Sequence, residues 1–211
     1  MNALILVDIQ NDFLPGGALA VSEGDQIVPV VNRLQPRFEL IVATQDWHPA
    51  NHGSFAANHA GKTPGTMIDL NGLPQMLWPV HCVQGTPGAG FAPGLKQTTW
   101  ARIFPKGTDT GIDSYSGFFD NGHRQATGLG EYLRGQGATD VYLTGLATDY
   151  CVKFTALDAV KLGFRTHLIA DACRGVNLQP GDVDRAIAEM RAAGVAITTS
   201  EALLAQPAHT P

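Results

Sequence analysis

Short apolar runs rich in β-branched residues recur along the chain. They are four or five residues long and begin at Ala3, Leu40, Val141, Thr166 and Val195. Runs of this length and composition are typical of strands that are buried on both faces of a sheet. Stretches with helical periodicity lie between several of these runs, and such alternation predicts βαβ units and a parallel sheet.

The helical periodicity is clearest over residues 149–162 and 183–193. Each stretch is followed by a glycine, Gly163 or Gly194, which is the residue that most often ends a helix. We therefore expect an α/β protein with a three-layer, doubly wound fold. Its central sheet should be mainly parallel, with about six strands and with helices on both faces.

Residues 49–94 interrupt this pattern. They are dense in glycine, proline, asparagine and histidine and show little periodicity. A loop of that length inside a compact domain is usually functional, so we interpret it as the wall and lid of a site. Because no linker or internal repeat divides the chain, we expect one domain over residues 1–205, with the lid insertion near 49–94 and a flexible tail at 206–211.

Composition and charge restrict the class of partner. Apolar residues make up 44% and charged residues 16%, and no apolar run approaches the roughly eighteen residues that a membrane span requires. The net charge of −5 and the absence of a lysine or arginine block argue against nucleic-acid binding. The first apolar run resembles a strand more than a signal peptide. We expect a cytoplasmic protein with a small-molecule partner, and the sequence leaves its oligomeric state open, a homo-oligomer included.

Polar side chains with catalytic potential follow the predicted strands. Asp8 comes after the first run, Asp46 and His48 after the second, Lys106 after "ARIF" and Cys151 after the run at Val141. Ligands of open parallel sheets bind beyond the carboxyl ends of the strands. We therefore expect these side chains to lie along one rim of the sheet.

Cys151 lies close to the predicted start of a helix. If Thr148 or Asp149 caps that helix, the unpaired N–H groups of its first turn would favour a thiolate. Asp8 could then act as the base and Lys106 as a nearby cation, which would make an acyl-transfer triad. The alternative is that Cys151 only fills the core, because unpaired cysteine is among the most buried residue types.

A second group of residues has the chemistry of a metal site. Two imidazoles and a carboxylate, from Asp46, His48 and His81, can bind one divalent transition metal ion and leave positions open for water or substrate. Zinc, iron and manganese suit this set about equally. The remaining candidates are assigned to solvent or to the core: His52, His59, Cys82 and Cys173.

Phe13 and Trp78 are large apolar residues near Asp8 and His81 in the chain. They could hold a flat ring between them by offset stacking. Ordinary core packing explains them equally well at this point.

Four long motifs carry a resemblance to a known family. In chain order they are "LVDIQNDFLPGGALAV" from Leu6, "ATQDWHPANHGSFA" from Ala43, "WPVHCVQGTPGAGF" from Trp78 and "GLATDYCVKFTALDA" from Gly145. Together they resemble the nicotinamidases, a branch of the isochorismatase-like cysteine hydrolases. The likeness runs from the first predicted strand to the final helix.

The resemblance implies hydrolysis of nicotinamide to nicotinate and ammonia through a cysteine thioester, a step of NAD salvage, with pyrazinamide as a further substrate. It implies roles for three sets of residues: catalysis by Asp8, Lys106 and Cys151, metal binding by Asp46, His48 and His81, and ring contacts by Phe13 and Trp78. It also implies an oxyanion hole formed by the backbone N–H groups of Ala147 and Cys151, a cis peptide bond between Leu146 and Ala147, and contact of Ser54 with a metal-bound water.

Three alternatives remain at this stage. Another isochorismatase-like amidase would share the cysteine chemistry but generally lacks the Asp-x-His metal set. A metal hydrolase could use a metal-bound hydroxide, with Cys151 only packing. A binding or scaffold protein could keep the fold without the chemistry, since fold alone does not establish function.

Overall fold

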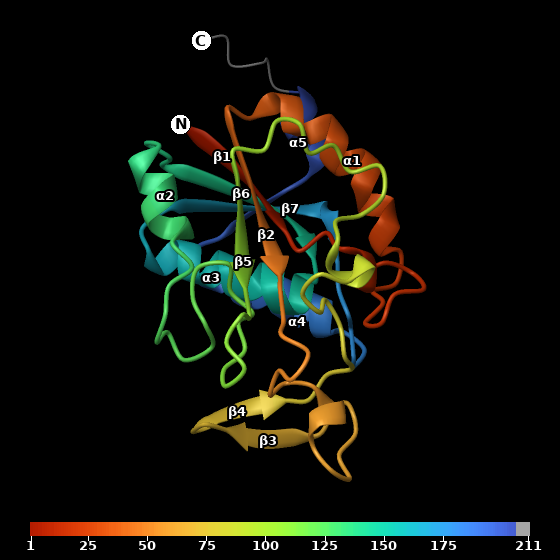
Figure 1. Ribbon diagram of the computed structural model, residues 1–211. Helices are drawn as coiled ribbons and strands as arrows, with labels where there is room; N and C mark the ends of the chain where they lie inside the picture. The colour runs from red at the N-terminus through yellow and green to blue at the C-terminus, as the bar shows by residue number, and fades with distance from the viewer. Residues whose placement is uncertain (206–211) are drawn as a thin grey trace.

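The computed structural model describes residues 1–205, and the predicted flexible tail at 206–211 lies outside the described residues. A central sheet of six strands has the order β5-β2-β1-β6-β7-β8, and every neighbouring pair is parallel (Figure 1). Its strands are β1 (Asn2–Val7), β2 (Leu40–Asp46), β5 (Arg102–Lys106), β6 (Asp140–Leu146), β7 (Arg165–Arg174) and β8 (Ala196–Thr198). The chain winds outward in both directions from β1, so the predicted doubly wound fold is confirmed.

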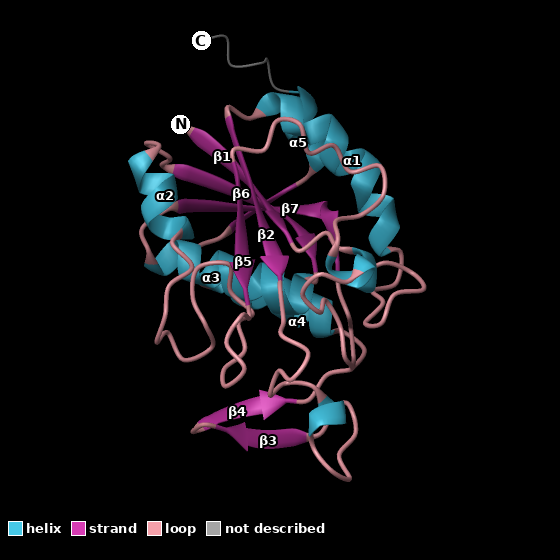
Figure 2. Ribbon diagram, in the orientation of Figure 1, coloured by secondary structure: helices cyan, strands magenta, loops and turns pink. Residues whose placement is uncertain are grey.

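Helices cover both faces of this sheet, as Figure 2 shows. One face carries α1 (Ile27–Leu34) and α5 (Ser200–Ala205), and the other carries α2 (Leu129–Gly135), α3 (Lys153–Lys161) and α4 (Asp182–Ala192). Short 3-10 turns lie at Asn11–Phe13, Gly24–Gln26, Gln35–Arg37, Ala56–Asn58 and Pro87–Ala89. No helix in the described part of the chain is long and apolar enough to cross a membrane.

Strand β1 shows why the sheet is buried on both sides. Ala3, Ile5 and Val7 pack into the core beneath α2, α3 and α4, whereas Leu4 and Leu6 pack into the core beneath α1. All five side chains are at most 1% exposed. Burying each of the larger ones contributes about 1.5–3 kcal/mol, which explains the continuous apolar run in the sequence.

The segment that leads into α3 differs from the sequence prediction. Residues Thr148–Val152 form one π-helical turn, in which the Val152 N–H bonds to the Ala147 carbonyl at 3.1 Å. The cap by Thr148 or Asp149 that the sequence analysis considered is not formed, because no side chain caps this turn. The Asp149 carboxylate instead accepts the backbone N–H groups of Val176 and Asn177 at 2.9 and 2.7 Å, so it holds a neighbouring loop.

The predicted lid contains an ordered hairpin that the sequence analysis did not identify. Strands β3 (Met67–Leu70) and β4 (Leu73–Met76) are antiparallel and joined by Asn71 and Gly72. Both turn residues have positive φ, 52° and 85°, as a type I′ turn requires. The Asn-Gly pair is the strongest short hairpin signal, so it could have been predicted. In Figure 1 the hairpin lies beyond the carboxyl ends of β2 and β5.

Candidate active site

Asp8, Lys106 and Cys151 come together at the carboxyl ends of the strands. The Lys106 Nζ atom lies 2.9 Å from Asp8 Oδ2 and 3.4 Å from Cys151 Sγ. Asp8 follows β1, Lys106 ends β5 and Cys151 lies in the π-helical turn after β6. None of the three residues is more than 7% exposed. The structure therefore brings together the three residues that the sequence placed on one rim.

Asp8 is held in a defined orientation. Its backbone has a positive φ of 47°, and the Thr44 hydroxyl donates a hydrogen bond to Asp8 Oδ1 at 2.6 Å. Burial raises the pKa of Asp8, although the Lys106 ammonium acts in the opposite direction. A carboxylate with a raised pKa is a stronger base toward a thiol than an exposed aspartate.

The charges of Lys106 and Cys151 follow from their surroundings. Burial alone would lower the pKa of Lys106, but Asp46 and Asp8 raise it well above its usual value, so the residue is an ammonium. Burial raises the pKa of the Cys151 thiol well above its usual value, with Lys106 opposing and Asp8 and Asp46 adding to the rise. The sequence analysis favoured a thiolate here. The surroundings instead favour a thiol, because two carboxylates and burial outweigh one cation, and the proton must pass to a base during the reaction.

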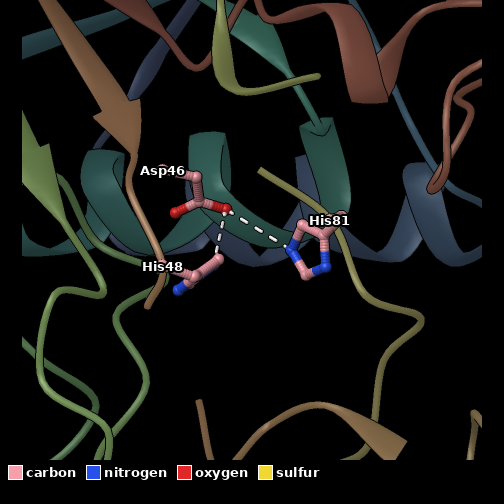
Figure 3. Close-up of side chains that lie close together, drawn as sticks. All are labelled: Asp46, His48 and His81. Carbon is pink, nitrogen blue, oxygen red and sulfur yellow. Dashed lines mark ion pairs between the residues drawn. The ribbon is translucent and has the colours of Figure 1, made fainter. Parts of the chain in front are cut away.

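Asp46, His48 and His81 form a second buried cluster beside these residues (Figure 3). The Nε2 atoms of His48 and His81 lie 3.4 and 3.7 Å from Asp46 Oδ2. Asp46 ends β2, His48 follows it two residues later, and His81 comes from the loop after the hairpin. The three ligand atoms are within 4.8 Å of one another.

The hydrogen bonds of the two imidazoles show that this cluster fits a metal ion. His48 Nδ1 lies 2.8 Å from the Gly107 carbonyl oxygen, and His81 Nδ1 lies 2.8 Å from the Pro79 carbonyl oxygen. A carbonyl only accepts, so each Nδ1 carries a proton, and in the neutral ring the Nε2 atom on the side of Asp46 is then free to bind a metal. Two such nitrogens and one carboxylate oxygen can hold a divalent transition metal ion.

His52 was predicted to be solvated, and this prediction is wrong. The residue is fully buried, and its ring centroid lies 4.4 Å from that of His48. Its Nδ1 accepts the Ser54 N–H at 3.2 Å, while its Nε2 has no hydrogen-bond partner among the described residues. His52 also lies within ligand distance of His48 and Asp113. One feature of the sequence could have indicated this burial, because His52 lies only four residues after His48.

The other residues that the sequence analysis left out of the site mostly lie where it expected them. Cys82 and Cys173 are 0% and 3% exposed, and burial raises the pKa of both thiols, to about 12 for Cys173, so both are packing residues as predicted. His59 is only partly buried, and its Nε2 lies 2.7 Å from the Gly53 carbonyl oxygen.

A cavity opens beside Cys151. Phe13 and Trp78 both line it, together with Asp46 and His81, so the two aromatic residues selected from the sequence face the candidate chemistry. The remaining lining residues were not predicted: Leu19, Asp113, Tyr115, Tyr150 and Val176.

Two tyrosines form much of the wall that the sequence analysis missed. Trp78 Nε1 donates to the Tyr115 hydroxyl at 3.0 Å, and the Tyr150 ring packs edge-on against Trp78 with centroids 4.9 Å apart. The Tyr150 hydroxyl donates to Met76 Sδ at 3.8 Å. Tyr150 precedes Cys151 in the chain, and that adjacency could have identified it. Tyr115 reaches the cavity only through tertiary packing.

The backbone near Cys151 has the form that the family resemblance implied. The peptide bond between Leu146 and Ala147 is cis, as predicted. Ala147 lines the cavity together with Cys151. Backbone N–H groups at these two positions are therefore available candidates for stabilising an oxyanion.

Comparisons with known proteins agree with this geometry. The isochorismatase domain family matches residues 2–202. The nicotinamidase of Escherichia coli is 55% identical over 93% of this chain and 94% of its own length. The nicotinamidase/pyrazinamidase of Mycobacterium tuberculosis is 37% identical over 95% of this chain and all of its own length.

Solved structures show the same similarity. A nicotinamidase pyrazinamidase of Acinetobacter baumanii superposes with a TM-score of 0.93 at 50% identity, covering 96% of this chain and 97% of its own. A pyrazinamidase of Pyrococcus horikoshii in complex with zinc superposes with a TM-score of 0.77 at 42% identity, covering 94% of this chain and 98% of its own.

Proposed function

The chain belongs to the isochorismatase domain family, and from that premise we propose that it hydrolyses nicotinamide to nicotinate and ammonia. It is a hydrolase that acts on a carboxamide. One observation carries the proposal: a single cavity presents the Cys151 sulfur, two residues of the metal cluster and the rings of Phe13 and Trp78. This combination recognises a flat ring bearing a nitrogen and a carboxamide.

Acylation begins with a proton transfer. Asp8 removes the proton of Cys151, and the sulfur attacks the carboxamide carbon to form a tetrahedral intermediate. The backbone N–H groups of Ala147 and Cys151 hold the developing oxyanion. Lys106 stabilises the anionic forms of its two neighbours. Asp8 then returns the proton to the leaving nitrogen, and ammonia departs from the thioester.

Deacylation uses the same groups in reverse. Asp8 takes a proton from water, the water oxygen attacks the thioester carbon, and the N–H groups of Ala147 and Cys151 hold the second oxyanion. The sulfur leaves and recovers the proton from Asp8. Nicotinate is released, and the resting thiol is restored.

Asp46, His48 and His81 are the residues that we propose to hold one divalent ion, for which zinc, iron and manganese are all suitable. When bound, such an ion supplies a Lewis acid for the nitrogen of the pyridine ring. Phe13 and Trp78 hold the ring faces, so the carboxamide points toward Cys151. We also propose that Ser54 contacts a water of this ion, because its N–H bonds to His52, whose ring centroid lies 4.4 Å from that of His48.

The proposal also covers the domain, its lid and the cellular compartment. Residues 1–205 form one isochorismatase-like hydrolase domain, in which the insertion at 49–94 acts as the lid. The enzyme works in the cytoplasm, where its three unpaired thiols stay reduced, and it returns the pyridine ring to NAD synthesis.

An ammonia-release assay tests the substrate. We expect turnover of nicotinamide and pyrazinamide, with values of kcat/KM within about a hundredfold of each other, because a pocket cannot easily reject a near-isostere. Benzamide, which lacks the ring nitrogen, should be poorer by at least roughly a hundredfold. A chelator and a thiol alkylator should each suppress the signal. Absence of ammonia from nicotinamide with added metal and reductant would refute the substrate assignment.

The pH dependence tests Asp8 as the base. Asp8 can accept the Cys151 proton only while it is a carboxylate. Because the pKa of Asp8 is raised, this carboxylate becomes protonated at a higher pH than an ordinary aspartate does. We therefore expect kcat/KM to drop on the acidic side with an apparent pKa above the ordinary aspartate value of about 3.9. Replacing Thr44 by valine removes a hydrogen bond that lowers the pKa of Asp8, so the acidic limb should move to higher pH. An acidic limb with an apparent pKa at or below the ordinary aspartate value would exclude Asp8 as the base.

A further inference from the structure

The Lys106 ammonium donates hydrogen bonds to Asp46, Ser114 and Cys151, and it forms an ion pair with Asp8. Its Nζ lies 2.5 Å from Asp46 Oδ1, 2.8 Å from the Ser114 carbonyl oxygen, 2.9 Å from Asp8 Oδ2 and 3.4 Å from Cys151 Sγ. An ammonium group donates three hydrogen bonds. All three protons are therefore used, and the hydrogen bond to the Cys151 sulfur is the longest of the three.

Asp46 belongs to both groups of residues. Its Oδ1 accepts from Lys106, and its Oδ2 faces the Nε2 atoms of His48 and His81. Gln10 holds the Asp46 backbone in place between the two sides. The Asp46 N–H donates to Gln10 Oε1 at 2.8 Å, and Gln10 Nε2 donates to the Asp46 carbonyl oxygen at 2.8 Å.

We infer that Lys106 and a divalent ion in the Asp46 cluster compete for the Asp46 carboxylate, and that ion binding shifts the Lys106 ammonium toward Cys151. The inference rests on the proposed metal centre. A carboxylate whose charge is drawn toward a divalent ion is a weaker acceptor for an ammonium group. Asp46 thus links the metal cluster to the nucleophile, and ion binding makes the sulfur more reactive before any substrate arrives.

The first test measures the sulfur directly. Wild-type protein is alkylated with iodoacetamide at fixed pH, with and without saturating manganese, and modification of the Cys151 peptide is followed by mass spectrometry. Manganese is the probe because soft thiolates bind it poorly. We expect alkylation to be roughly tenfold faster with the ion, a common size for coupling between two sites. An unchanged or slower rate would overturn the inference.

A ligand variant controls for effects of manganese elsewhere on the protein. His81→Ala removes one ligand of the cluster but leaves Asp46, Lys106 and Cys151 in place. Its alkylation rate should no longer respond to manganese. If the variant responds as strongly as the wild type, the acceleration does not come from this cluster and the inference is wrong.

The second test uses the reciprocity of coupling. If the ion weakens the contact of Lys106 with Asp46, then Lys106 weakens binding of the ion by the same factor. Manganese affinity, measured by chelator competition, should therefore be roughly tenfold tighter in Lys106→Met than in wild type. Lys153→Met is the matched control, since Lys153 pairs with Glu189 on the surface, and it should bind as the wild type does. Equal or weaker binding by Lys106→Met would contradict the inference.

The outcomes separate the inference from the proposals on which it rests. Wild-type protein that binds none of manganese, zinc or iron would remove both the metal centre and the inference. Binding without any change in alkylation would remove only the inference, because ammonia release from nicotinamide is measured independently. Should Lys106→Met fail to fold, the wild-type alkylation experiment still decides the question.

Discussion

Replacing Cys151 by alanine is expected to lower kcat for nicotinamide by at least about 10⁴-fold, because the nucleophile of a covalent mechanism has no substitute. The cavity keeps its metal cluster and its aromatic walls in this variant, so nicotinamide should still bind. Ammonia release gives the rate, and calorimetry gives the dissociation constant for nicotinamide.

The same variant separates two mechanisms. In a metal hydrolase, a metal-bound hydroxide would attack and Cys151 would only pack, so Cys151→Ala would keep most of its turnover. Cys173→Ala is the matched control, since that thiol is also buried but bonds to the Ile169 carbonyl in β7 and does not line the cavity. It should keep near wild-type activity. Substantial ammonia release by Cys151→Ala would eliminate the thioester mechanism.

Loss of the metal cluster is expected to act mainly on substrate binding. His81→Ala should raise KM for nicotinamide by at least roughly a hundredfold, since the ion proposed to bind the ring nitrogen is lost while Asp8, Lys106 and Cys151 remain. Treatment of the wild type with a chelator should have the same effect. Adding metal back should restore the chelated wild type but not the variant. Steady-state kinetics on nicotinamide measure both parameters.

A loop histidine provides the control for this experiment. His59 lies in the same insertion and contacts the Gly53 carbonyl oxygen instead of the cluster, so His59→Ala should leave KM within about threefold of wild type. A chelated enzyme with an unchanged KM would show that the ring nitrogen does not depend on an ion. The aromatic walls would then be the main determinants of binding.

The positions of Asp8, Asp46, Lys106 and Cys151 could be predicted because they depend on topology. Each lies at or just after the carboxyl end of a buried strand, and these ends meet at one edge of a parallel sheet. The apolar runs identify the strands directly. For these residues the order of secondary structure along the chain was sufficient to predict the rim of the site.

Other parts of the site depend on tertiary packing, which the pattern of apolar and polar residues along the sequence does not predict. Tyr115 reaches the cavity because Gln75 and Trp78 donate to its hydroxyl, and neither contact is visible in the sequence. His52 was judged by the average exposure of loop histidines, whereas its own loop folds inward. The pKa direction of the Cys151 thiol could not be predicted from the sequence, because it depends on how burial and two carboxylates oppose one ammonium.

The β3–β4 hairpin has a consequence for how such amidases diversify. Its strands pair with each other and with no strand of the central sheet. It nevertheless reaches the cavity wall through Gln75, which bonds to Tyr115, and Met76, which contacts Tyr150. Mutations on this appendage can reshape the cavity wall for a different amide while the strand pairing of the central sheet is kept. Selection for new substrates therefore has a place to act outside the strand pairing of the central sheet.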